Sequence, residues 1–179
     1  GKIHIKRMYT EGVRMDGQNM HSNFIFPLEQ ISNDTVRYFT RYSYLPIADG
    51  TDMEFYFPND PEKHIAKIKH AKHDGTAVHD GHPGQLFTVT FTKPLPYTVD
   101  KDTLCLAAYW EPDLYTCSDS VFKNIAGAGH LSRIDHMRIS NCTYQNLMNS
   151  GILLGTELPT HVEGGHATDV IIKDCTFDG

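Results

Sequence analysis

One polar stretch near the start of the chain has the residue types of an acid–base or ligand-binding site. Within six residues it carries a carboxylate (Asp16), two amides (Gln18 and Asn19) and an imidazole (His21). A carboxylate can transfer a proton at a reacting group, and amides and imidazoles can fix the hydroxyl groups of a ligand. On an extended strand, however, Asp16 and His21 point to opposite faces, so spacing alone does not make them partners. The alternative is a polar corner in which Asn19 binds the main chain.

A second polar group is rich in histidine but has no metal-binding pattern. Its histidines, near the Asp-Gly pairs at 74–75 and 80–81, are His64, His70, His73, His79 and His82. A catalytic metal site needs three convergent ligands, and this group has no ligand pair at helical spacing. We therefore expect a solvated hairpin loop and no metal site.

Two further carboxylates, Glu157 and Glu163, lie in a segment with Pro and Gly punctuation and no periodicity, over residues 156–166. These features indicate a long loop. Such a loop could line a groove, although polar residues in long loops are most often simply solvated.

A short repeat indicates which elements position these residues. The copy at residues 141–146 is matched closely at 174–179, loosely at 119–124 and most loosely at 7–12. Each copy places an aromatic residue after a small or apolar one, followed by Asn or Gly. Asp119 and Asn141 are 22 positions apart, and Asn141 and Asp174 are 33 apart, which is typical of stacked repeat units. Short apolar runs bounded by Gly, Asn and Asp favour strands, so we predict coils of a right-handed parallel β-helix.

The repeat is absent between residues 24 and 115, where about six short strand candidates occur. The clearest of them are Met53–Phe57, Ala66–Ala71, Leu86–Phe91 and Leu104–Ala107. Strands at this spacing predict a small barrel or sandwich. We therefore expect an all-β chain with β-helix coils at 1–23 and 116–179 and an inserted barrel-like domain at 24–115.

Composition excludes several classes of partner. The net charge is −6 and the 16 Lys and Arg residues form no cluster, so a nucleic-acid surface is not expected. No apolar run is long enough to span a bilayer. The chain begins without Met or a signal segment and stops at a turn, so we expect a piece of a longer protein whose remaining coils are its partners.

The four cysteines have no C-x-x-C spacing, which argues against a structural zinc site or a thioredoxin-type motif. Cys142 and Cys175 occupy the same repeat position. We expect them to lie near one another as small buried hydrophobes rather than as a disulfide.

Three motifs in this order resemble a known enzyme family. They are Met15-Asp16-Gly17-Gln18-Asn19-Met20-His21, Phe91-Thr92-Lys93-Pro94-Leu95-Pro96 and Ser150-Gly151-Ile152-Leu153-Leu154. Together with the predicted architecture, they make the chain similar to glycoside hydrolase family 110, the exo-acting α-1,3-galactosidases, which are β-helix enzymes with β-barrel insertions. The likeness covers nearly all of the 179 residues but only part of the family's length.

The resemblance implies an inverting hydrolase that removes terminal α-linked galactose from oligo- or polysaccharides. The family pattern Asp-Asp-Ala-Thr-Asn-Val-His-Gly makes Asp16 the catalytic acid or base and makes Asn19 and His21 sugar-binding residues, whereas Gly17 stands in place of the second aspartate. Inverting hydrolysis needs two carboxyl groups roughly 6.5–9.5 Å apart and a water, but no cofactor. Glu157 and Glu163 are the remaining candidates for the second carboxyl group, and we also expect them among the substrate-binding residues. The substrate class implies secretion or the periplasm.

Other functions stay open on the sequence. The replacement at Gly17 favours a carbohydrate-binding β-helix without catalysis. A structural β-helix segment of a surface protein is a third possibility. A polysaccharide lyase needs a basic residue or a metal beside an acidic sugar, and near Asp16 only Arg14 is basic.

Overall fold

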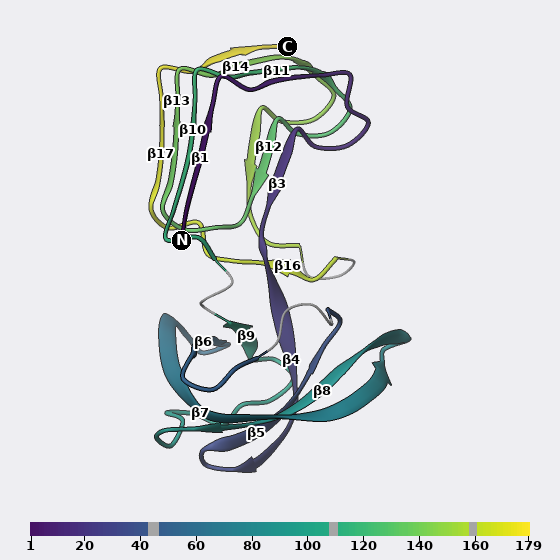
Figure 1. Cartoon of the computed structure of the whole chain (residues 1–179), viewed down its shortest axis with the longest axis vertical. Coiled ribbons are helices and arrows are strands. Elements are labelled where there is room, and N and C mark those ends of the chain that lie inside the picture. The colour runs from purple at the N-terminus through teal and green to yellow at the C-terminus, as the bar shows by residue number, and fades with distance from the viewer. Residues whose placement is uncertain (43–46, 108–110, 158–160) are drawn as a thin grey trace. The chain divides into compact units, whose positions relative to one another are not determined.

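A computed structural model describes residues 1–42, 47–107, 111–157 and 161–179 (Figure 1). In these residues the regular elements are all β-strands. The chain divides into two compact units, one formed by Gly1–Ser22 with Glu111–Gly179 and the other by Asn23–Trp110. We call them the parallel-sheet unit and the barrel unit. The expected insertion ran from 24 to 115, whereas Leu114 and Tyr115 here begin a strand of the parallel-sheet unit.

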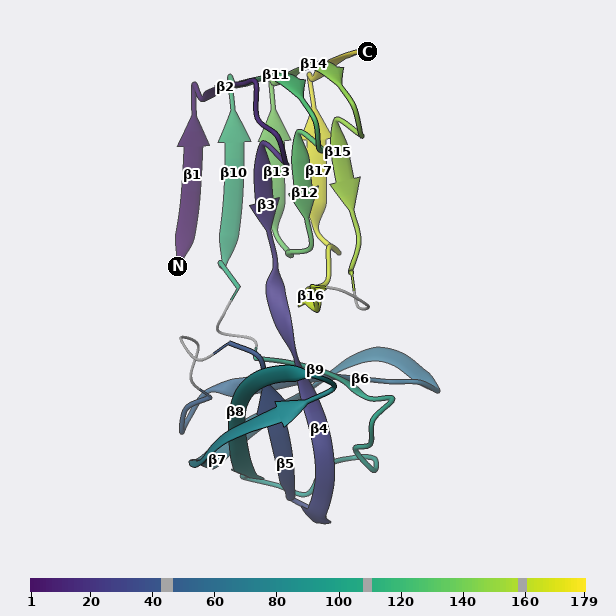
Figure 2. The same ribbon diagram turned by 90° about the vertical axis from the view of Figure 1, so that its right-hand side faces the viewer.

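The parallel-sheet unit contains three sheets whose paired strands are all parallel (Figure 2). The first sheet contains β1 (Lys2–Lys6), β10 (Leu114–Ser118), β13 (Met137–Ser140) and β17 (Val170–Lys173). The second contains β2 (Tyr9–Glu11), β11 (Val121–Ile125), β14 (Thr143–Leu147) and β18 (Thr176–Asp178). The third contains β3 (Gln18–Met20), β12 (His130–Ser132) and β15 (Ile152–Leu154). A further short strand, β16 (Glu163–Gly164), comes after β15 in the chain and is not part of this sheet. Successive segments therefore contribute one strand to each sheet in turn.

The register of the second sheet explains the aromatic position of the repeat. Phe122 pairs with Tyr144, and Tyr144 pairs with Phe177. Their rings are stacked, with centroids 5.3 Å and 4.9 Å apart. In the loosest copy the partner of Phe122 is Thr10, not Tyr9, and the Tyr9 side chain is exposed. The repeat therefore encodes an aromatic ladder that three of its four copies form.

The Asn and Asp residues of the repeat turn the chain between the first and second sheets. Asp119, Asn141 and Asp174 have φ values of 52°, 53° and 53°, a left-handed conformation that Asn and Asp tolerate better than most residues. Asn141 Nδ2 donates to Asp119 Oδ1 at 2.6 Å, and five residues further along the repeat Asn146 Nδ2 donates to Asn124 Oδ1 at 2.7 Å. These side-chain ladders satisfy polar groups at both ends of the second-sheet strands.

Apolar side chains and free thiols fill the interior of this unit. The core consists of Tyr115, Cys117, Phe122, Ile125, Ile134, Met137, Ile139, Cys142 and Tyr144. All four cysteines lie in the described residues, and all are free thiols. Cys142 is buried and its thiol donates to the Ser140 carbonyl oxygen at 3.3 Å, whereas Cys175 is half-buried.

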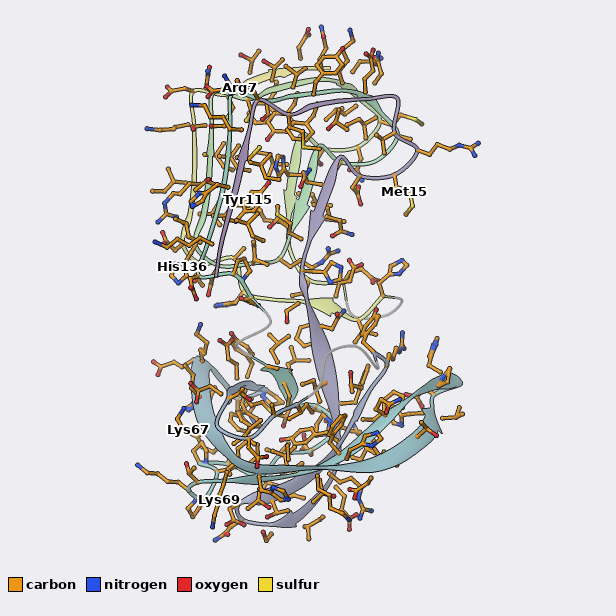
Figure 3. The ribbon with its side chains drawn as sticks, in the orientation of Figure 1. Arg7, Met15, Lys67, Lys69, Tyr115 and His136 are labelled. Atoms are coloured by element: carbon orange, nitrogen blue, oxygen red, sulfur yellow. The ribbon has the colours of Figure 1, made fainter. Side chains whose placement is uncertain are left out.

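One imidazole lies inside this core. His130 is fully buried, its Nε2 lies 3.2 Å from the Tyr115 hydroxyl and its Nδ1 lies 2.9 Å from the Tyr144 hydroxyl. Figure 3 shows Tyr115 in the interior of the unit. A neutral imidazole has one donor and one acceptor, so one tyrosine donates to it and the other accepts from it. Burial lowers the pKa of His130 to about 4.

The buried imidazole predicts a loss of stability in mild acid. An unfolded His has a pKa near 6.5, so between pH 6.5 and 4 the unfolded state binds one more proton than the folded state. The free energy of unfolding should therefore fall by about 3 kcal/mol as the pH drops through this window. Urea titrations of the 179-residue chain at several pH values measure this loss. His130→Gln should flatten the profile between pH 6.5 and 4, and an unchanged slope would assign the effect to other groups.

The barrel unit is antiparallel and closed. Its strands are β4 (Ser22–Ser32), β5 (Thr35–Thr40), β6 (Asp52–Phe57), β7 (Asp60–His79), β8 (His82–Phe91) and β9 (Leu104–Ala107). They pair in the order β4-β5-β8-β7-β6-β9, and β9 pairs again with β4. The core includes Tyr38, Met53, Phe55, Ile68, Val89, Phe91 and Cys105. The predicted small closed β-structure is thus confirmed as a six-stranded barrel.

The histidine-rich segment is not the predicted loop. His64, His70, His73 and His79 all lie in β7, a strand of 20 residues that also contains the expected separate strand Ala66–Ala71. Only Asp80 and Gly81, with φ values of 48° and 78°, form a turn, and it is the two-residue type of a β-hairpin. The other Asp-Gly pair is absorbed by a bulge, since the register shifts between His73 and Gly75.

Each histidine of β7 has a separate partner. His64 binds Asp60 at 2.9 Å and His70 binds Asp49 at 3.2 Å. His73 contacts Gln85, and His79 lies 3.5 Å from Asp80. Across the described residues, no three His, Cys, Asp or Glu side chains are placed to share a metal ion. Within that same part of the chain, no helix has the length and apolar character needed to cross a membrane.

Candidate functional site

Three of the residues singled out from the sequence meet around one arginine. Arg133 Nη1 lies 2.9 Å from Glu163 Oε2 and donates to Asn19 Oδ1 at 3.5 Å. His21 Nε2 lies 3.3 Å from the other oxygen of Glu163. We call these four residues the Arg133 cluster. Both carboxylate oxygens of Glu163 therefore face a nitrogen.

The third sheet brings the cluster together. Met20 of β3 pairs with Ser132 of β12, so His21 and Arg133 are the residues that directly follow two paired strands. The Arg133 N–H donates to the Met20 carbonyl oxygen at 2.8 Å, which extends the pairing by one residue. The segment that carries Glu163 comes close through Gly165, where a side chain would collide with the Arg133 carbonyl oxygen.

Glu157 lies directly across from Glu163. The two residues form an isolated antiparallel bridge in which each N–H donates to the other's carbonyl oxygen at 3.0 Å. Residues opposite each other in such a pair project to the same face, with Cβ atoms about 4.5–5.5 Å apart. Glu157 Oε2 accepts a hydrogen bond from the His161 N–H at 2.7 Å. The bridge thus presents two carboxylates on one face.

The ion pair of the cluster is largely withdrawn from solvent. The side chain of Arg133 is 5% exposed and that of Glu163 is 13% exposed, whereas His21 is 25% exposed. Burying charges costs several kcal/mol per ion unless they are paired and hydrogen-bonded. Arg133 Nε and the Ser132 hydroxyl are buried and have no hydrogen-bond partner among the described residues. Such atoms are uncommon in folded proteins and are typical of polar sites that contact a ligand or water.

Asp16 has a different environment. Its Oδ1 accepts a hydrogen bond from the Ala128 N–H at 2.8 Å. A side chain at Gly127 would collide with the same carboxylate oxygen. Asp16 therefore ties the turn before β3 to the turn before β12, which resembles the polar corner that the sequence left open, with Asp16 rather than Asn19 as the corner residue.

Gly17 belongs to a column of glycines, one directly before each strand of the third sheet. The other two are Gly129 and Gly151. A Cβ atom on Gly17 would lie 2.8 Å from Phe122 Cδ1 and 2.8 Å from the Gly129 carbonyl oxygen, closer than real Cβ atoms approach. At Gly129 it would meet the Tyr144 ring, and at Gly151 the Phe177 ring. The glycines leave room for the aromatic ladder, and a second carboxylate at position 17 has no space.

Arg133 is the member of the cluster that the sequence did not single out. A signal for it exists in the repeat. Once residues 18–20 are aligned with 130–132, as the strands pair, His21 and Arg133 occupy equivalent positions in neighbouring segments. The residue that directly follows the third-sheet strand is therefore polar after both β3 and β12.

No model of a known protein family matches this chain, and no curated protein is significantly similar to it. The Arg133 cluster and the Glu157–Glu163 bridge are therefore the features from which a function can be inferred.

Proposed function

We propose that the three parallel sheets are the faces of a right-handed parallel β-helix. The support is the strand order: β1, β2 and β3 are followed in each sheet by β10, β11 and β12, and then by β13, β14 and β15. Parallel strands joined by crossover connections are right-handed in nearly all proteins. In such a solenoid each turn of the chain buries its apolar residues against its neighbours.

We further propose that this β-helix is part of a glycoside hydrolase resembling the exo-acting α-galactosidases. One observation carries the proposal: Glu163 is held by Arg133 and His21 while Glu157 projects to the same face of its bridge. Inverting hydrolysis uses two carboxyl groups roughly 6.5–9.5 Å apart, one to protonate the leaving oxygen and one to activate a water. The Cβ atoms of opposed residues lie about 4.5–5.5 Å apart, so this role requires the two glutamate side chains to diverge toward their carboxyl groups. Glu163 and Glu157 take these roles in our assignment. The chemistry needs no cofactor.

Arg133, His21 and Asn19 have supporting roles in this proposal. Arg133 fixes the orientation of the Glu163 carboxylate through the 2.9 Å ion pair. Asn19 is exposed and His21 is partly exposed, so both can reach sugar hydroxyl groups. Asp16, the expected catalytic residue, becomes a positioning residue of the corner because its carboxylate is bonded to the main chain. Secretion or a periplasmic location would follow from the substrate class.

The test is release of galactose from an α-1,3-galactosyl disaccharide by the 179-residue chain. Replacing a general acid or base typically costs a factor of about 10²–10⁴, so Glu163→Gln should lower the rate by about 100-fold or more. Asp16→Asn should change the rate only a few-fold in protein that remains folded. A rate unaffected by Glu163→Gln, or abolished by Asp16→Asn without unfolding, would return the catalytic role to Asp16 or remove it from the cluster.

A second candidate is carbohydrate binding without hydrolysis. It is favoured by the crowded surroundings of Gly17, which admit no second aspartate beside Asp16. One experiment distinguishes carbohydrate binding from hydrolysis. Saturable binding of the disaccharide that Asn19→Ala and His21→Ala weaken, with no galactose released, would establish the binding function and exclude the hydrolase.

A further inference from the structure

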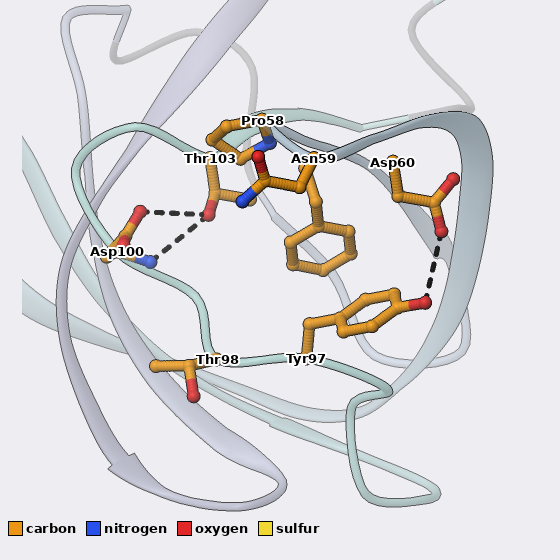
Figure 4. A pocket seen from close by; sticks show the side chains of 8 residues that line it. Pro58, Asn59, Asp60, Tyr97, Thr98, Asp100 and Thr103 are labelled. Atoms are coloured by element: carbon orange, nitrogen blue, oxygen red, sulfur yellow. Dashed lines mark hydrogen bonds between the residues drawn. The ribbon is translucent and has the colours of Figure 1, made fainter.

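The barrel unit contains a pocket of about 270 Å³ between two turns of the chain (Figure 4). One side comes from the end of β6 and the start of β7, with Phe57, Pro58, Asn59 and Asp60. The other comes from the segment before β9, with Tyr97, Thr98, Asp100 and Thr103. The volume is slightly below the roughly 300–1,000 Å³ of sites for drug-sized ligands, so it suits one small ring rather than a chain of them.

One wall of the pocket is aromatic and fixed in place. The rings of Phe57 and Tyr97 pack edge to face with centroids 4.9 Å apart, and the His64 ring lies 5.5 Å from each. Phe57 is buried, whereas Tyr97 is 50% exposed. The Tyr97 hydroxyl donates to Asp60 Oδ2 at 3.1 Å, and His64 Nε2 binds the same oxygen at 2.9 Å. An exposed ring is thus held in one orientation by contacts within the protein.

The opposite wall is polar. In Figure 4 Asp100 and Thr103 lie across the pocket from the Tyr97 ring. Asp100 Oδ1 accepts from the Thr103 hydroxyl at 3.2 Å and from the Asp102 N–H at 3.0 Å. Asn59 and Thr98 add an exposed amide and an exposed hydroxyl. This wall therefore offers both donors and acceptors beside an apolar ring.

We propose that this pocket is a second binding site, for a single neutral sugar ring. A pyranose has an apolar C–H face that packs on an aromatic ring and hydroxyl groups that need donors and acceptors around its rim, which are the two walls described. This pocket is built from residues of the barrel unit alone, and its binding of a sugar does not depend on hydrolysis at Glu163. It adds a place at which the protein can hold a carbohydrate without reacting with it.

The charge of the pocket argues against other small ligands. The hydrogen bond from His64, followed by that from the Glu62 N–H, holds the pKa of Asp60 below its usual range. With Asp60 ionised and Asp100 nearby, a phosphate or a uronic acid would be repelled. An organic cation would be attracted, but Asp60 already accepts bonds from His64, Tyr97 and the Glu62 N–H. Asp100 likewise accepts bonds from the Thr103 hydroxyl and the Asp102 N–H. Beside the exposed Tyr97 ring, the amide of Asn59 and the hydroxyl of Thr98 are uncharged groups that can bind a ligand.

Titration of the 179-residue chain with methyl glycosides of neutral hexoses, followed by amide chemical shifts, tests the proposal. At least one hexose should give saturable shifts at 57–60 and 97–103. Tyr97→Ala should weaken this binding at least tenfold, and Tyr97→Phe, which keeps the ring, should weaken it only a few-fold. Tyr9→Ala, at an exposed tyrosine of the parallel-sheet unit, is the matched control and should have no effect.

The outcomes also separate this site from the Arg133 cluster. Glu163→Gln should leave the shifts at 57–60 and 97–103 unchanged, and Tyr97→Ala should leave any galactose release unchanged. Binding of choline or galacturonate at these residues in preference to every neutral hexose would overturn the proposal. So would hexose binding at the pocket that is equal in the wild type and in Tyr97→Ala.

Discussion

Replacing Gly17 by Asp is expected to unfold the parallel-sheet unit rather than to supply a missing catalytic carboxylate. The new Cβ atom would lie 2.8 Å from Phe122 Cδ1 and 3.0 Å from Ile125 Cδ1, inside the core. Overpacking of this kind costs about 1–3 kcal/mol, and burial of a polar group without a partner costs about 2–7 kcal/mol more. The sum approaches the whole stability of an ordinary domain, about 5–15 kcal/mol.

Urea unfolding of three variants separates the two costs. Gly17→Ala adds only the crowding and should lose about 1–3 kcal/mol. Met15→Asp adds the same carboxylate two residues earlier, where the side chain is 73% exposed and lies on the outside of the unit (Figure 3), and should lose less than about 0.5 kcal/mol. If Gly17→Asp is as stable as Met15→Asp, or if it increases hydrolysis, then position 17 does have room for a side chain. That result would support the pair of catalytic aspartates that the family resemblance implies.

The glycine column shows what the sequence could and could not predict. Gly17, Gly129 and Gly151 each precede a strand of the third sheet, and this pattern is present in the chain itself. Its meaning depends on which aromatic ring fills the space, namely Phe122, Tyr144 and Phe177. For Gly17 and Gly151 the ring lies more than 20 residues away in the sequence. The sequence around Gly17 is therefore equally consistent with the loss of a catalytic aspartate at this position.

Predictions that depended on local chemistry fared best. The strand candidates between 24 and 115 close into a barrel. The predicted loop at His73 and Asp74 was wrong because Gly75 there forms a bulge within a long strand rather than a turn. A dipeptide that often marks a turn cannot distinguish these two uses of glycine, since both need its positive φ.

The candidate site was found only in part for a related reason. Asn19, His21, Glu157 and Glu163 could be singled out by residue type. Arg133, which contacts Glu163 and Asn19, lies between Ser132 and Ile134 without any local motif. Nothing in its immediate sequence distinguishes a buried Arg from a solvated one. Alignment of the repeat by strand register, rather than by letter similarity, is what makes His21 and Arg133 equivalent.

Replacing Arg133 by Met is the second change expected to have a large effect. It keeps the length of the side chain but leaves Glu163, which is 13% exposed, with the His21 imidazole as its remaining contact within this cluster. Breaking a buried ion pair by removing one partner costs about 3–5 kcal/mol. Arg138→Met is the matched control because Arg138 pairs with Asp169 at 2.7 Å on the surface, where such pairs contribute about 0–1 kcal/mol.

A double-mutant cycle measured by urea unfolding identifies the origin of that cost. If the penalty comes from the stranded Glu163 charge, then Glu163→Gln in the Arg133→Met background should restore most of the lost stability, because a neutral amide is far less costly to bury than a carboxylate. Equal losses in Arg133→Met and Arg138→Met would mean that the cluster is effectively solvated. A large loss that Glu163→Gln does not relieve would instead assign Arg133 a packing role and weaken Glu163 as the carboxylate that the arginine holds in position.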